Sequence, residues 1–83
     1  SCDTTPEFLC IPKGIIGLNK GCLSGQDNLI EVTLPDTVQN IGLSCFANCP
    51  NLTKIRCKGD LAKFDTLLKS GNEGVIVNVH TFR

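Results

Sequence analysis

The chain has 83 residues, of which 41% are hydrophobic and 19% are charged, so it suits one small folded domain and excludes a disordered segment. Its eight basic and eight acidic residues give a net charge of zero, so it lacks the basic excess that is typical of nucleic-acid binding. No apolar run reaches the roughly 18 residues that a membrane-spanning helix requires.

Along the chain, residues 6–11 predict a partial strand, and two similar stretches follow it at residues 11–33 and 34–56. The second stretch repeats the first at an offset of 23 residues, and nearly every apolar position is kept. The matched pairs include Ile11 with Leu34, Pro12 with Pro35, Leu18 with Ile41, Cys22 with Cys45, and Leu29 with Leu52. A period of 20–29 residues with Leu-x-x-Leu-x-Leu spacing is typical of a leucine-rich repeat.

Each repeat predicts one short strand that lies beside the strand of the previous repeat, about 4.8 Å away. Alternate residues point inward, so Val32 and Leu34 should pack against Ile55 and Cys57. One repeat cannot bury this face alone, whereas stacked repeats can. The predicted continuous core contains Leu29, Val32, Leu34, Val38, Ile41, Phe46, Leu52 and Ile55.

The C-terminal part predicts a degenerate third copy at residues 57–79. Residues 61–70 have helical spacing, and Gly71 suits the position that ends a helix. Residues 74–79 (GVIVNV) predict a final strand. One repeat position holds Asn19, Gly42 and Asp65, and all three residue types tolerate the left-handed backbone region.

Residues 29–55 carry a distinctive pattern of apolar, proline and cysteine residues, namely Leu29, Val32, Leu34, Pro35, Val38, Ile41, Gly42, Phe46, Cys49 and Leu52. This pattern resembles the BspA-like class of leucine-rich repeats, found in surface and secreted proteins of host-associated bacteria and some protists. The resemblance implies an α/β repeat fold, a short solenoid with a small parallel sheet and a short C-terminal helix, in a single domain over residues 1–83. Departures are Cys45 where alanine is usual and Gln26 where the first copy should carry the cysteine.

The six cysteines leave three readings open. Buried free thiols are favoured, because Cys45 and Cys57 take positions that are apolar elsewhere in the repeat. A disulfide is the second reading, either between Cys22 and Cys45, whose parallel side chains suit stacking better than bridging, or between Cys2 and Cys10. The third is a zinc set of Cys45, Cys49, Cys57 and His80.

No catalytic motif accompanies these residues, since the sequence offers a single histidine near its end, no serine elbow and no phosphate-binding loop. We therefore expect no enzyme, no cofactor and no metal. The outward strand positions are the candidates for binding, and they are Phe8, Glu31, Thr33, Lys54 and Arg56, with Cys10 beside Phe8. The same positions would also suit a solvated polar surface with Glu31 and Lys54 as a weak cross-strand pair.

The resemblance implies a protein–protein recognition or adhesion module of a secreted or cell-surface repeat protein, with another protein as its partner. The alternative is a structural capping or spacer segment of a longer array without a ligand of its own. The chain begins with Ser1 and Cys2 rather than methionine, so we expect it to be an excised or processed piece.

Overall fold

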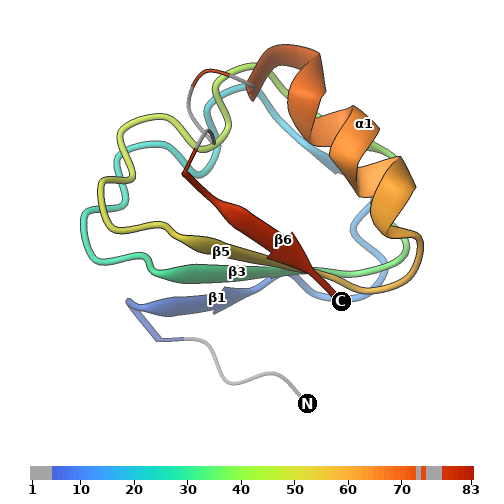
Figure 1. Ribbon diagram of the computed structural model, residues 1–83, viewed down its shortest axis with the longest axis horizontal. Helices are drawn as coiled ribbons and strands as arrows, with labels where there is room; N and C mark the ends of the chain where they lie inside the picture. Colours follow the sequence, from blue (N-terminus) through green and yellow to red (C-terminus); the bar gives the residue numbers. More distant parts are fainter. Residues whose placement is uncertain (1–4, 73, 75–77) are drawn as a thin grey trace.

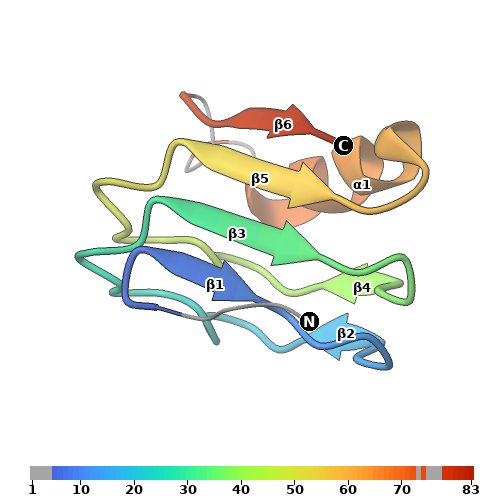
Figure 2. The same ribbon diagram turned by 90° about the horizontal axis from the view of Figure 1, so that it is seen from below.

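The strands form two sheets, each made of parallel strands, on opposite sides of the core. The computed structural model describes residues 5–72, 74 and 78–83. Within them, β1 (Phe8–Cys10), β3 (Glu31–Leu34), β5 (Lys54–Cys57) and β6 (His80–Phe82) form a four-stranded sheet in that order. A smaller sheet pairs β2 (Gly17–Leu18) with β4 (Asn40–Ile41). Helix α1 (Leu61–Asn72) lies on the same side of the larger sheet as the smaller one (Figures 1 and 2).

The pairing register confirms the repeat of 23 residues. In the larger sheet Leu9 pairs with Val32, which in turn pairs with Ile55. In the smaller sheet Leu18 pairs with Ile41 at the same offset. Each of the two full repeats therefore supplies one strand to each sheet, and the chain advances by one strand spacing per repeat.

The core fills the space between the two sheets and the helix. All eight residues that the repeat pattern placed inside are buried, with exposed fractions of at most 8%, so this prediction is confirmed. Cys57 from β5 and Phe64 and Leu68 from α1 complete the same cluster. Burying each large aliphatic or aromatic side chain contributes about 1.5–3 kcal/mol, which accounts for the stacking of repeats that are individually too thin to fold.

The predicted C-terminal helix and its end at Gly71 are confirmed. The side chain of Asp60 accepts a hydrogen bond from the Ala62 amide at 3.0 Å and so caps the first turn. Ser70 leaves helical geometry, and Gly71 has a φ of 104°, which a residue with a side chain rarely adopts. Asn72 is buried there, and its amide donates to the Gly42 carbonyl at 2.9 Å.

The final strand lies further along the chain than residues 74–79. The prediction was therefore wrong for the described residues of that range. Asn78 and Val79 precede β6, which begins at His80; residues 75–77 lie outside the described part. Lys54 pairs with His80, an offset of 26 instead of 23. The reason is that α1 replaces the short corner of the earlier repeats. The segment between β5 and β6 is therefore three residues longer than the segment between β3 and β5.

The interpretation of Asn19, Gly42 and Asp65 as left-handed corner residues was also wrong. None of them has a positive φ, and Asp65 lies inside α1. Gly42 is required for another reason, because a β-carbon there would lie 2.5 Å from the backbone nitrogen of Lys20 in the preceding repeat. Close approach of two backbones, rather than an unusual backbone angle, therefore explains this glycine.

Candidate functional site

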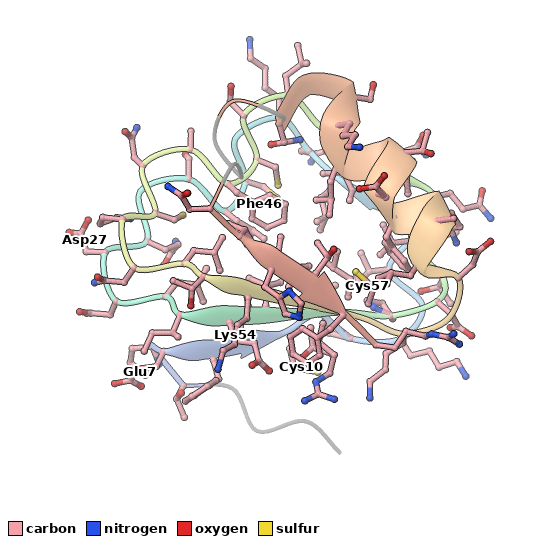
Figure 3. The ribbon with its side chains drawn as sticks, in the orientation of Figure 1. Glu7, Cys10, Asp27, Phe46, Lys54 and Cys57 are labelled. Carbon is pink, nitrogen blue, oxygen red and sulfur yellow. The ribbon has the colours of Figure 1, made fainter. Side chains whose placement is uncertain are left out.

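The larger sheet has one face packed on the core and one face that no other described element covers (Figure 2). Figure 3 shows Lys54 and Cys10 on the opposite side of the sheet from Phe46 and Cys57. We call the uncovered side the open sheet face. Alternation along the paired strands assigns to it Phe8, Cys10, Glu31, Thr33, Lys54, Arg56, His80 and Phe82.

All five residues predicted as binding candidates lie together on the open sheet face. Phe8, Glu31 and Lys54 occupy one row across neighbouring strands, and Thr33 and Arg56 occupy the next. Neighbouring strands lie about 4.8 Å apart, so the rows form one continuous surface of about 14 Å across four strands. The Phe8 side chain at the edge of this surface is 48% exposed.

Two residues of the open sheet face were missed from the sequence. His80 extends the first row beside Lys54, and Phe82 extends the second row beside Arg56. Their rings stack on each other with centroids 5.6 Å apart and planes 12° from parallel. The alternation of His80, Thr81 and Phe82 could have signalled a strand, but the stronger valine alternation before it drew the prediction to residues 74–79.

The Arg56 side chain makes two contacts with other residues of this face. Its guanidinium carbon lies 4.7 Å from the centre of the Phe82 ring, and its Nε lies 3.7 Å from Glu31 Oε2. The ion pair is partly exposed, so it contributes less than about 1 kcal/mol, and the ring contact contributes about as much again. A side chain already held on two sides loses less conformational freedom when a partner binds.

The expected Glu31–Lys54 ion pair is replaced by a diagonal one. Glu31 and Lys54 are neighbours in the register, as predicted, but the ion pair of Glu31 is made with Arg56. Arginine reaches diagonally across the strands, and Phe82 beneath its guanidinium favours that position. The Lys54 side chain remains exposed to solvent.

These side chains surround a shallow hollow of about 310 Å³, lined by Glu31, Lys54, Arg56, His80 and Phe82. Cationic groups and aromatic surface meet in it. Lysine and arginine donate hydrogen bonds to a carboxylate, whereas the ring of Phe82 offers apolar contact. The hollow can therefore receive an acidic group with an apolar neighbour.

The four residues of the alternative zinc set are not brought together. Cys45 and Cys57 are buried, whereas His80 lies exposed on the open sheet face. In the described part of the chain, no three histidine, cysteine, aspartate or glutamate side chains are grouped so that they could hold a metal ion. Within the same residues no helix is long and apolar enough to cross a membrane.

Among residues 5–83 as far as the structure describes them, the cysteines are one bonded residue and four free thiols. Cys10 is disulfide-bonded, and Cys2, its expected partner, lies outside the described residues. The free thiols are Cys22, Cys45, Cys49 and Cys57.

Burial alone raises the pKa of the Cys57 thiol from 9.0 to about 11. We therefore expect Cys22, which is exposed, to react with Ellman's reagent in the native protein at pH 8, and Cys57 to react only when the protein unfolds. Mass mapping of the labelled peptides at early times checks this order. Equal rates for both thiols would contradict the burial of Cys57.

The sequence comparisons give one match. A family model described as a BspA type leucine rich repeat region with six copies matches residues 2–70. The matched region includes both full repeats, β1, β3, β5 and most of α1. No curated protein and no solved structure matches the chain.

Proposed function

Because the chain belongs to the BspA-type leucine-rich-repeat family, whose repeats in general mediate protein–protein interaction and are generally not enzymes, we propose that it is a protein-recognition or adhesion module. In this proposal residues 1–83 form a single domain, a short segment of a leucine-rich-repeat solenoid. Its repeats are about 11–33 and 34–56, with a degenerate copy at 57–79. The partner is another protein, and it binds the open sheet face.

The observation that carries this proposal is the uncovered sheet face with its two ordered rows of side chains. Packing does not fix the identity of these residues, because their side chains point away from the core. The face still presents an exposed Phe8 at one edge and a held Arg56 near the other, both of which are residue types that bind partners well. Aromatic side chains at the edges are not favoured on a face that only contacts water, because their apolar surface is poorly solvated.

The charges of the face favour an acidic partner surface. Glu31 is already paired with Arg56, whereas Lys54 is exposed and makes no ion pair within the described residues. One glutamate against Lys54 and Arg56 leaves a local excess of one positive charge. We propose that the partner places an aspartate or glutamate with an apolar neighbour into the hollow beside Phe82.

Replacing Arg56 by alanine is expected to weaken partner binding tenfold or more and to lower the free energy of unfolding by less than about 2 kcal/mol, because the ion pair and the ring contact are both lost. The measurement is surface plasmon resonance against a panel of purified extracellular protein domains, with urea unfolding of the same variant. The matched control is Lys20→Ala, which removes one positive charge from an exposed position outside the sheet face. If Lys20→Ala abolishes binding and Arg56→Ala leaves it intact, the recognition surface lies on the other side of the molecule.

We place the module outside the cell, on a secreted or cell-surface protein, as is typical of its family. The bonded state of Cys10 supports this proposal, because disulfides persist mainly in oxidising compartments. Antibody staining of intact, unpermeabilised cells tests it, and a signal that appears only after permeabilisation would exclude the surface location.

The alternative is a structural spacer that separates other repeats and has no ligand. The polar composition of the outward rows is the observation that favours it, since Glu31, Thr33 and Lys54 also suit contact with water. The same panel decides between the two functions. If the chain is a spacer, no domain of the panel should bind it in a way that replacement of Lys54 or Arg56 weakens.

A further inference from the structure

Cys22 and Cys45 occupy the same position in consecutive repeats, and their sulfur atoms lie 3.4 Å apart. Cys22 is exposed, whereas Cys45 is fully buried. Both are free thiols in the structure. A disulfide bond is about 2.05 Å long, so the sulfur atoms need to approach by only about 1.4 Å, which side-chain rotation supplies.

The backbone holds the two residues at this separation. The Gly21 amide donates to the Leu43 carbonyl at 3.1 Å, and the Gly25 amide donates to the Ala47 carbonyl at 2.9 Å. These hydrogen bonds join the two repeats on both sides of the cysteine pair. Chains joined in this way run about 5 Å apart, which is within the range of α-carbon separations that disulfides require.

The repeat pattern restricts this geometry to one pair. Cys49 corresponds to Gln26 in the preceding repeat, and Cys57 corresponds to Leu34, so neither has a sulfur atom at the equivalent position. The Cys49 thiol donates instead to the Leu23 carbonyl at 3.2 Å. Among the four free thiols, Cys22 and Cys45 alone share a repeat position.

We propose that Cys22 and Cys45 form a redox modification site, in which oxidation joins their sulfur atoms in a disulfide that staples consecutive repeats together. The oxidant is a small-molecule disulfide such as oxidised glutathione. The site is independent of the proposed partner binding, because both cysteines lie in turns outside the strands of the larger sheet.

The reaction proceeds by two thiol–disulfide exchanges. Cys22, which a small molecule can reach, attacks one sulfur of the oxidant and forms a mixed disulfide; the released thiolate takes up the proton that Cys22 lost. Cys45 then attacks the Cys22 sulfur, breaks the mixed disulfide, and its proton goes to the second released thiolate. The two protein thiols lose two electrons in total, and the oxidant is reduced to two thiols.

The second exchange is the slow one. In the reduced pair, burial first and the hydrogen bond to Cys22 second raise the pKa of the Cys45 thiol to about 12. Burial persists in the mixed disulfide and keeps the pKa of Cys45 above its ordinary value there. Only the thiolate attacks a disulfide, and its population rises with pH well below the pKa. We therefore expect the closing step to accelerate between pH 7 and pH 9, while the mixed disulfide at Cys22 accumulates at the lower pH.

The full chain is incubated with oxidised glutathione at pH 8.5 and then analysed by thiol titration under denaturing conditions and by peptide mass mapping. We expect the four free thiols to fall to two, with a peptide cross-linked through Cys22 and Cys45. A Cys45→Ser variant should instead stop at a glutathione adduct on Cys22, and Cys49→Ala should close like the natural chain. A persistent adduct on Cys22 in the natural chain, or four unreacted thiols, would overturn the proposal.

A second measurement compares the melting temperatures of the oxidised and the untreated chain. The bond would close a loop of 23 residues, so the oxidised chain should melt roughly 10–25 °C higher than the untreated chain. Cys22→Ser treated in the same way controls for effects at Cys10. An oxidised chain that carries the cross-link but melts no higher than before would show that the bond does not staple the repeats.

Discussion

Replacing Phe46 by alanine is expected to lower the free energy of unfolding by about 4 kcal/mol, because a buried ring is removed and the surrounding core cannot fully close the cavity. Phe46 is 1% exposed and belongs to the single cluster that joins both sheets and α1. Figure 3 shows it on the core side of the larger sheet. Domains of this size are stable by only about 5–10 kcal/mol, so the variant should lose much of its stability.

Urea unfolding followed by circular dichroism measures this loss. Phe8→Ala is the matched control, since it makes the same chemical change at a residue that is 48% exposed. The control should change the free energy of unfolding by about 0.5 kcal/mol or less. Equal effects at the two positions would show that Phe46 does not lie in the core that the repeat pattern defines.

Replacing Gly42 by alanine is expected to cost about 3 kcal/mol, although only one methyl group is added. The new β-carbon would lie 2.5 Å from the Lys20 nitrogen and 2.7 Å from the Asn19 carbonyl carbon. Both are backbone atoms and cannot rotate away. Gly42 cannot move easily either, because its amide donates to the Leu18 carbonyl at 2.8 Å and its carbonyl accepts from Asn72 at 2.9 Å.

Gly17→Ala is the control for this prediction. A β-carbon at Gly17 would meet its nearest atom, in the Asn40 side chain, at 3.6 Å, which is an ordinary contact. Since alanine also loses less backbone freedom than glycine on folding, this variant should be as stable as the natural chain to within about 0.5 kcal/mol. The two melting curves can be compared directly. If Gly42→Ala and Gly17→Ala have the same melting temperature, the two repeats do not approach as closely as the structure shows.

Much of the candidate site could be predicted because it belongs to the periodic part of the chain. Once Val32 and Leu34 are placed inward, Glu31 and Thr33 must point outward, and the offset of 23 puts Lys54 and Arg56 beside them. The role of these residues in binding stays a prediction. Their placement on one uncovered face required only the alternation of a strand and the length of the repeat.

His80 and Phe82 could not be placed in the same way. Their strand follows α1 at an offset of 26, so the period that located every other strand of the larger sheet fails there. Valine alternation in residues 74–79 is a strong local signal for a strand. Local preference gives no information on how many residues a helix and its return need before the chain reaches the sheet again.

The sequence by itself determined the repeat length, the inward and outward positions of β3 and β5, the buried core and the end of the helix at Gly71, because each follows from short-range periodicity or from the properties of one residue type. Only the tertiary structure decided the position of β6, the capture of Arg56 between Glu31 and Phe82, and the 3.4 Å approach of Cys22 and Cys45. Each of these depends on where side chains from different repeats meet. That meeting is set by the packing of the assembled core and not by the local sequence.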